Sequence, residues 1–253
     1  MAEPARDHAL VLRLRELGES DLLVDFFGRR IGRGTAIAKG ARRSRKRFFG
    51  LLLVGHLLEL ELWPSKSGDL WRLEAAWLLE NHQALRADWR RWLFGAPVLE
   101  LLLRATASHD PHPAALDLAL RALSACGQAS DKKLLASRLL VFCLLLASEL
   151  GYGLSLEHCV RCGRPVADEP GLALSPEGGL VCGQCPAGPR ARPLAPGLRQ
   201  GLRTALALPA DKKDRLAFPL PLAREGLAFM HQYWAETIGA DLGALTVAVD
   251  CLA

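Results

Sequence analysis

The chain has 253 residues, of which 50% are hydrophobic and 23% charged, and its 32 Lys and Arg residues against 27 Asp and Glu residues give a formal net charge of +5. This is the composition of a globular protein, and it argues against disordered, collagen-like and coiled-coil classes. At about 100–200 residues per domain, the length predicts one large domain or two to three small ones. The longest strongly apolar stretch, residues 139–146, is far shorter than the roughly 20 residues that cross a bilayer, which predicts a soluble, cytoplasmic protein with no membrane partner.

The first 80 residues have the pattern of a β-rich domain. One run covers residues 51–63, in which Glu59 and Glu61 alternate with Leu58, Leu60 and Leu62, and shorter β-type runs cover residues 9–15, 21–27 and 34–38. Such alternation is typical of half-buried strands. Glycines separate these runs at short intervals, which favours a small, closed or partly closed antiparallel barrel over alternating βαβ units. We therefore predict a β-barrel over residues 1–80.

From about residue 80 the hydrophobic period changes to three and four residues, as amphipathic helices require. We expect helices around residues 85–102, 116–123, 196–208 and 222–238. The longest predicted helix covers residues 132–150 and ends at Gly151, a residue suited to a C-terminal cap. The predicted fold class is thus α+β. The barrel is followed by an α-helical bundle domain, residues 81–157 and 194–253, with a four-cysteine module, residues 158–193, inserted in it.

Four of the seven cysteines form two Cys-x-x-Cys pairs, namely Cys159, Cys162, Cys182 and Cys185. The 19 residues between the pairs match the spacing of four-cysteine zinc sites. Each pair places two sulfurs on one side of a tetrahedron, and four thiolates leave no open position for a catalytic water, so we predict a structural Zn²⁺. A thioredoxin-like redox pair and an iron–sulfur cluster are the alternatives that the same thiols allow.

The other cysteines and a neighbouring histidine are expected to have no ligand role. His158 adjoins the first pair but breaks the paired spacing, which makes it a bystander. Cys126, Cys143 and Cys251 lie singly among apolar residues, the usual environment of inert core cysteines. The predicted metal site therefore consists of the two pairs alone.

A segment without acidic residues lies between Phe26 and Leu58 and is strongly basic. Its nine cations are Arg29, Arg30, Arg33, Lys39, Arg42, Arg43, Arg45, Lys46 and Arg47. The last six lie in a glycine-flanked run that we expect to form a loop between barrel strands. A cationic loop beside a barrel suits a phosphate backbone, so we predict that these six residues bind DNA. The alternatives are a solvated surface, or an interaction adaptor whose basic loop binds an acidic protein partner.

Phe48 and Phe49 follow the basic run directly. Aromatic rings next to cations can stack on bases, but bulky apolar residues before a strand are more often buried. We therefore expect both phenylalanines to anchor the next strand in the core. For Asp21 and Asp25, which would share one strand face, we expect a surface polar role.

The sequence carries no phosphate-binding loop, dinucleotide fingerprint, hydrolase nucleophile elbow or His-Glu-x-x-His motif. We therefore predict a protein with no catalytic residues and no ATP-driven activity. A zinc-dependent hydrolase is a third alternative, which the saturated set of four thiolates disfavours.

Two separated stretches resemble the RecO family of bacterial DNA repair proteins. Residues 15–24, 32–33, 38–43 and 47–48 resemble its N-terminal barrel, and residues 149–152, 159–163 and 175–182 resemble its helix and zinc segment. By position, Lys39, Arg42, Arg43 and Arg47 match the basic loop of the family, whereas Arg45 and Lys46 extend it by charge alone. Cys159, Cys162, Cys182 and Cys185 match the zinc ligands of members that keep all four.

The resemblance implies an OB-fold barrel, a helical domain and a zinc module in one chain. It also implies a non-enzymatic recombination mediator of the RecF pathway that binds single- and double-stranded DNA and anneals complementary strands. With RecR, such a protein helps to load RecA onto DNA coated by single-strand binding protein. It would act in the bacterial cytoplasm, at the nucleoid during repair.

Overall fold

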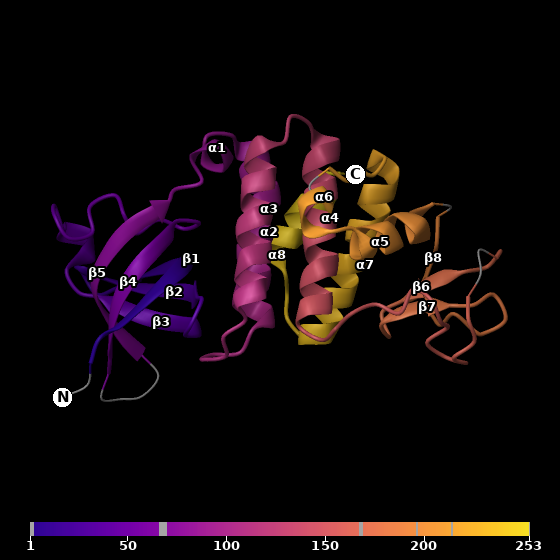
Figure 1. The fold of residues 1–253 in the computed structure, drawn as a ribbon, viewed down its shortest axis with the longest axis horizontal. Coiled ribbons are helices and arrows are strands. Elements are labelled where there is room, and N and C mark those ends of the chain that lie inside the picture. Colours follow the sequence, from indigo (N-terminus) through magenta and orange to yellow (C-terminus); the bar gives the residue numbers. More distant parts are fainter. Residues whose placement is uncertain (1–2, 66–69, 167–168, 196, 214, 253) are drawn as a thin grey trace. The chain divides into compact units, whose positions relative to one another are not determined.

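The computed structural model describes residues 3–65, 70–166, 169–195, 197–213 and 215–252. The chain divides into two compact units, residues 1–84 with 99–120 and residues 85–98 with 121–253. The first unit contains a β-barrel, and the second contains helices and a small sheet with the cysteine pairs (Figure 1). In the described part of the chain, none of the helices is long and apolar enough to cross a membrane. The predicted α+β class is confirmed.

Five strands form a closed barrel in the order β1-β2-β3-β5-β4. Their bounds are β1 (Ala5–Leu17), β2 (Asp21–Gly28), β3 (Gly32–Ala38), β4 (Leu57–Pro64) and β5 (Leu70–Glu80). The paired strands are antiparallel except β3 and β5, which are parallel. In β4, Leu58, Leu60 and Leu62 are fully buried, while Glu59 and Glu61 between them are partly exposed. The alternation therefore has the physical origin predicted for it, a strand with one face in the core.

The strand predicted from residue 51 begins only at Leu57. The preceding residues form a loop, in which the Leu51 N–H donates to the carbonyl of Phe48 at 3.1 Å. Gly50 has a φ of 69°, a left-handed conformation that no strand continues through. Leu52 in this loop is buried against the barrel core. The loop is therefore apolar for the same reason as a strand would be, although its backbone is not extended.

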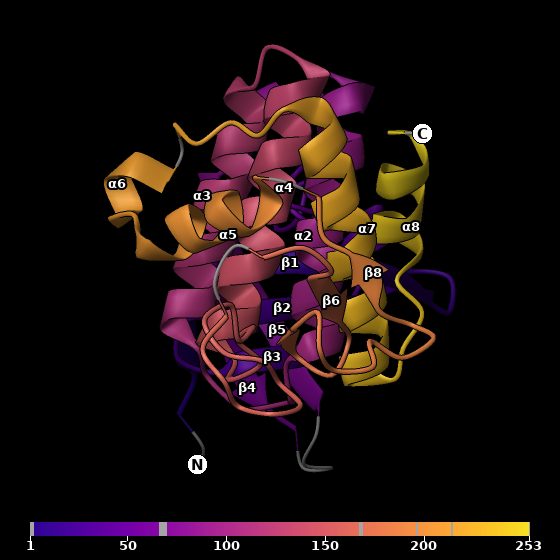
Figure 2. The ribbon, with the colours of Figure 1, turned by 90° about the vertical axis from the view of Figure 1, so that its right-hand side faces the viewer.

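Eight helices are present in the described chain. They are α1 (Gln83–Arg86), α2 (Trp89–Ala105), α3 (Pro113–Gln128), α4 (Lys132–Glu149), α5 (Leu198–Ala207), α6 (Ala210–Lys213), α7 (Leu220–Ile238) and α8 (Gly243–Asp250). The Asp131 carboxylate caps α4 by accepting the N–H of Leu134 at 2.8 Å, and Gly151 beyond its end has a φ of 84°. α4 packs against α7 (Figure 2), where the Trp234 indole N–H donates to the carbonyl of Cys143 at 3.2 Å. The short α8 was not predicted, because eight residues are too few to establish a helical period.

A small sheet lies between α4 and α5 in the chain. Its strands are β6 (Ala173–Ser175), β7 (Gly179–Val181) and β8 (Arg192–Pro193), in the order β7-β6-β8. All residues of β6 and β7 are buried, although each strand has only three residues. So few strand residues form only a small hydrophobic core. A bound metal ion would supply stability that this core does not.

Candidate metal centre and nucleic-acid interface

The first cysteine pair lies in a tight turn closed by a β-bridge between His158 and Pro165. The Gly163 N–H donates to the carbonyl of Cys159 at 2.9 Å, and Gly163 has a φ of 73°. This left-handed residue lets the chain reverse directly after Cys162. The turn therefore holds the two sulfurs of this pair on the same side.

The second cysteine pair follows β7 directly. The Cys185 N–H donates to the carbonyl of Cys182 at 3.1 Å, which closes a second tight turn. The two turns are joined by a hydrogen bond from the Val160 N–H to the carbonyl of Leu180 at 2.8 Å. This backbone bond joins two cysteine pairs that are distant in the sequence.

The four sulfurs fit a tetrahedral metal ion. All four Sγ atoms of Cys159, Cys162, Cys182 and Cys185 lie within 4.8 Å of one another, and the Cys162 and Cys182 sulfurs are 3.9 Å apart. In a tetrahedron with Zn–S bonds of about 2.3 Å, neighbouring sulfurs are about 3.8 Å apart. The Cys182 N–H also donates to the Cys159 sulfur at 3.4 Å, a contact that stabilises a thiolate. The structure therefore brings together all four cysteines that the spacing predicts.

The electrostatics of the cluster are those of closely spaced acids. The Arg164 guanidinium is the largest influence on Cys182 and lowers the pKa of that thiol to about 6. Hydrogen bonds with the thiols of Cys162 and Cys182 raise the pKa of Cys185 to about 12. Four sulfurs at this distance can all ionise only with a cation among them, which is the condition that a divalent metal meets.

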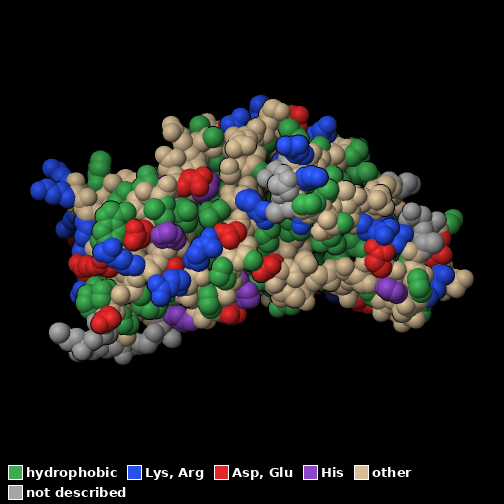
Figure 3. Space-filling view, in the orientation of Figure 1, with side chains coloured by type: hydrophobic (Ala, Val, Ile, Leu, Met, Phe, Trp, Pro, Cys, Tyr) green, Lys and Arg blue, Asp and Glu red, His purple; other side chains and the backbone are tan. Residues whose placement is uncertain are grey.

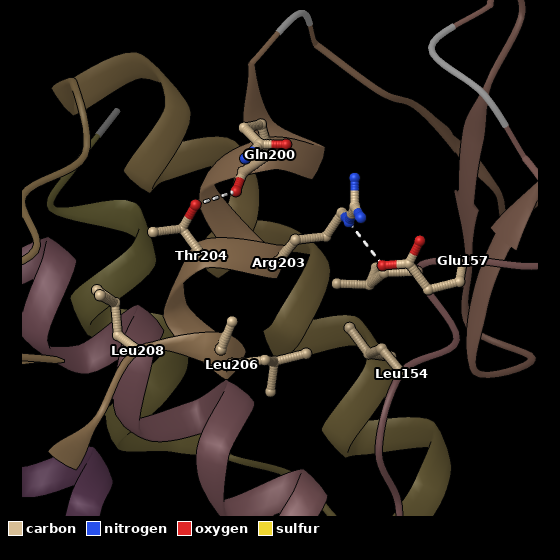
Figure 4. Close-up of a pocket in the computed structure, with 9 residues that line it drawn as sticks. Leu154, Glu157, Gln200, Arg203, Thr204, Leu206 and Leu208 are labelled. Atoms are coloured by element: carbon tan, nitrogen blue, oxygen red, sulfur yellow. Dashed lines mark hydrogen bonds and ion pairs between the residues drawn. The ribbon is translucent and has the colours of Figure 1, made fainter.

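One buried arginine attaches this segment to the helices. Arg199 on α5 is only 5% exposed and donates to the carbonyls of Leu156 at 3.1 Å and Val166 at 2.5 Å. Beside it, a pocket of about 570 Å³ lies between α5 and the segment leading into the first turn. Leucines line this pocket, and the ion pair between Arg203 and Glu157 crosses it at 2.6 Å (Figure 4). Both arginines therefore link α5 to the cysteine segment.

The basic run forms the connection between β3 and β4. Lys39 follows β3, and a single 3₁₀ turn, η1 (Ala41–Arg43), comes next. The start of this connection is hydrogen-bonded to residues at the turn between β1 and β2. The Asp21 carboxylate accepts the Gly40 N–H at 2.8 Å, and the Ser20 carbonyl accepts the Arg42 N–H at 3.0 Å. The Gly40 N–H, followed by the Ser20 hydroxyl that donates to the same carboxylate at 2.8 Å, lowers the pKa of Asp21, so the carboxylate that anchors the loop is ionised.

The six predicted DNA-binding cations are exposed, and three of them pair with carboxylates of the barrel. The distances are 3.0 Å from Arg42 to Glu16, 3.1 Å from Arg43 to Glu19 and 3.3 Å from Arg47 to Glu74. Within the part of the chain that the structure describes, the other three, Lys39, Arg45 and Lys46, have no ion-pair partner. At the left of Figure 3, over the barrel, Lys and Arg side chains protrude beside exposed hydrophobic ones. Both cations that extend the family pattern by charge alone are thus among the three unpaired ones.

Two of the other cations of the basic segment have structural contacts within the first unit. Arg29 forms an ion pair with Asp117, and Arg33 donates from Nε to the carbonyl of Thr106 at 2.9 Å. The carbonyl of Arg33 in turn accepts the His109 N–H at 2.9 Å. These two arginines therefore hold residues 106–117 against the β2–β3 hairpin. Counting the charges of the basic segment could not show that these two have a structural role.

The two phenylalanines after the basic run differ in environment. Phe48 is 3% exposed and belongs to the barrel core, as predicted. The prediction that Phe49 is also buried is wrong, because its side chain is 73% exposed. The Arg47 guanidinium carbon lies 4.5 Å from the centre of the Phe48 ring. Of the two adjacent rings, the first therefore packs in the barrel core and the second lies in solvent.

Two further expectations about single residues are wrong. Cys251 is exposed, unlike Cys126 and Cys143, which are fully buried. Asp25 is 3% exposed and accepts hydrogen bonds from Arg13 and Thr35 at 2.7 Å, with Arg15 at 3.0 Å. A carboxylate with three such donors can be buried, which a single strand pattern cannot show.

Comparison with known proteins identifies both parts of the chain. Residues 1–82 match the family model described as recombination protein O N terminal, and residues 86–246 match recombination protein O C terminal. A DNA repair protein RecO from Anaeromyxobacter dehalogenans (strain 2CP-C) is 34% identical over 236 residues, which is 91% of this chain and 92% of the relative. RecO from Syntrophobacter fumaroxidans is 34% identical over 84% of each chain, and RecO from Frankia casuarinae is 35% identical over 71% of this chain and 72% of the relative. The chain therefore belongs to the RecO family, a family of non-enzymatic mediators of DNA repair and recombination.

Proposed function

We propose that this protein binds single- and double-stranded DNA, anneals complementary strands and, with RecR, promotes RecA loading on DNA coated by single-strand binding protein. The observation that carries the proposal is the loop of exposed cations between β3 and β4, at Lys39, Arg42, Arg43, Arg45, Lys46 and Arg47. Family membership supports the partners. We place this activity in the bacterial cytoplasm, at the nucleoid during repair.

Binding by this loop requires no rearrangement of the barrel. Arg45 and Lys46 can contact phosphates at once, since no carboxylate competes for them among the described residues. Arg42 and Arg43 exchange Glu16 and Glu19 for phosphates, and exposed ion pairs of this kind are worth only about 0–1 kcal/mol. Cations that neutralise two strands together reduce their repulsion, so complementary strands meet at high local concentration without ATP.

We also propose that Cys159, Cys162, Cys182 and Cys185 hold a structural Zn²⁺. The cluster geometry supports a divalent ion, and a Zn²⁺ bound there would fold the short strands β6 and β7 around it. We propose domain limits at residues 1–80 for the barrel, 81–157 with 194–253 for the helical domain, and 158–193 for the inserted module. β5 ends at Glu80, and the two matched family models meet between residues 82 and 86, which supports the first limit.

The test is fluorescence-detected annealing of two complementary oligonucleotides without ATP, across a salt series, beside a DNA-binding titration. We expect acceleration that fades as salt rises, because counterion release drives the contacts. Tight binding without acceleration would leave a DNA-binding protein that does not anneal. If no DNA is bound at low salt, and an acidic polypeptide is bound instead, the adaptor alternative replaces the proposal.

A further inference from the structure

Phe49 is the most exposed large hydrophobic side chain among the described residues, at 73%. Exposing a phenylalanine to water is unfavourable, and it lies here beside the basic loop of a protein whose family acts in DNA repair. Single exposed apolar residues are common, so exposure alone assigns no role. The conformation of the loop and its charges add two independent observations.

The backbone of the preceding residue, Phe48, is fixed by hydrogen bonds within the loop, and the Phe49 ring points into solvent. The Phe48 N–H donates to the Ser44 hydroxyl at 3.1 Å, and the Phe48 carbonyl accepts the Leu51 N–H at 3.1 Å. The Phe48 ring packs in the barrel core, while the ring of Phe49 is left in solvent. Gly50, with a φ of 69°, then reverses the chain. The exposed ring therefore sits on a backbone that is already ordered, and binding through it costs little conformational entropy.

The charges around Phe49 favour a polyanion with flat apolar groups. Arg45 and Lys46, four and three residues before it, are exposed and have no ion-pair partner in the described chain. An acidic protein surface would satisfy these cations but offers few flat apolar groups to cover the ring. An unpaired nucleotide offers both, a phosphate for the cations and a base for the ring.

We propose that Phe49 stacks on an unpaired base of single-stranded DNA and sets the preference of the loop for single strands over duplex. This inference rests on the proposed function, since it assumes that the loop cations bind DNA. In a duplex the bases are already stacked on one another, so the duplex gains phosphate contacts but not this stack. When two strands pair, the base leaves the ring, and the annealed product is held less tightly than the single strands.

The experiment compares the full-length protein with Phe49→Ala and Phe49→Trp, and with Trp89→Ala as a matched control. Trp89 is also an exposed aromatic residue, 67% exposed, but lies on α2. Each protein is titrated with a single-stranded oligonucleotide containing 2-aminopurine and with a duplex of the same length, over several salt concentrations. Thermal unfolding of each variant checks that the substitution of this exposed side chain leaves the protein folded.

We expect Phe49→Ala to lower single-strand affinity roughly tenfold or more, with duplex affinity within about twofold of wild type. The salt slopes for both DNAs should not change, because no charge is removed. The change in 2-aminopurine fluorescence on binding should persist with Phe49→Trp and disappear with Phe49→Ala, while Trp89→Ala behaves as wild type.

Two results would overturn the inference and leave the proposed function intact. One is wild-type affinity of Phe49→Ala for both DNAs. The other is equal weakening for single strand and duplex, which would mean that Phe49 shapes the loop instead of stacking. If the wild-type protein binds neither DNA, the proposed function fails, and this inference fails with it.

Discussion

Arg199 donates a hydrogen bond from its Nε to the backbone carbonyl of Leu156, 3.1 Å away. The arginine is a helix residue of α5, and the leucine precedes the first cysteine turn by three residues. A second donor of the same guanidinium reaches the carbonyl of Val166, just beyond that turn. One buried side chain thus holds both ends of the turn that carries Cys159 and Cys162.

Replacing Arg199 with alanine should detach this turn from α5. Two backbone carbonyls would lose their donors, so we expect the free energy of unfolding to fall by about 2–3 kcal/mol. Zinc content should stay close to wild type at low temperature, because none of the four cysteines changes. The measurement is thermal unfolding together with metal analysis. Arg203→Ala is the control, since its exposed ion pair with Glu157 should contribute less than about 1 kcal/mol.

Replacing Cys162 with serine should lower metal content and thermal stability together. Three thiolates and a hydroxyl bind Zn²⁺ less tightly than four thiolates, and the small sheet has little core of its own. Metal analysis and thermal unfolding measure the two effects. Cys251→Ser is the control, because Cys251 is also an exposed cysteine but lies outside the cluster. A metal-free variant of full stability would refute the structural role of the metal.

Replacing the five loop cations from Arg42 to Arg47 with alanine should weaken DNA binding without unfolding the barrel. These residues are Arg42, Arg43, Arg45, Lys46 and Arg47, and all five are exposed. Each lost phosphate contact reduces the slope of log K against log salt by about 0.7 for single strands, so the slope should fall by up to about 3.5. Binding titrations over a salt series measure this change. An unchanged slope would contradict the assignment of these residues.

Replacing Glu19 with glutamine should strengthen DNA binding. Glu19 pairs with Arg43 at 3.1 Å and competes with phosphate for its guanidinium. The pair is exposed on both sides, so we expect a gain of about twofold at low salt that disappears at high salt. Glu61→Gln is the matched control, because it removes the same charge from the same barrel but breaks the ion pair with Arg6 instead, which keeps its contact with Glu59 at 3.8 Å. Equal gains in both variants would mean that only the net charge matters.

The stability of the barrel should depend on pH through Asp25. Burial raises the pKa of this carboxyl, but hydrogen bonds from Thr35, Arg13 and Arg15 more than offset burial and hold it below the usual value. The ionised form therefore stabilises the fold above a pH of about 4, and this contribution is lost as the pH falls below that.

Asp25→Asn should accordingly cost about 1–3 kcal/mol of unfolding free energy at pH 7. The difference from wild type should shrink as the pH falls from about 4 through the lowered pKa of the wild-type carboxyl. Chemical denaturation at several pH values measures this difference, with the exposed Asp241→Asn as the control. A cost that is the same at every pH would show that the charge of Asp25 contributes nothing.

Much of the fold could be predicted because its signals are local. The alternation over Leu58, Leu60 and Leu62 identifies a half-buried strand without any knowledge of its neighbours. The apolar length of α4 and the glycine after it define a central helix in the same way. The four cysteines are identified by two short spacings, since a tetrahedral metal ion requires pairs of sulfurs on tight turns. Strand order is not local, and the parallel pairing of β3 with β5 had no signal in the sequence.

The sequence by itself determined the fold class, the four clustered cysteines and the position of a basic loop, because periodicity, spacing and composition are properties of neighbouring residues. Only the tertiary structure decided which cations are already paired. Arg43 meets Glu19 across 24 residues of chain, and Arg45 meets no carboxylate in the described chain. It also decided which of two adjacent phenylalanines is exposed. The Phe48 N–H is bound to the Ser44 hydroxyl and its ring packs in the barrel core, so Phe49, the next residue, is left in solvent.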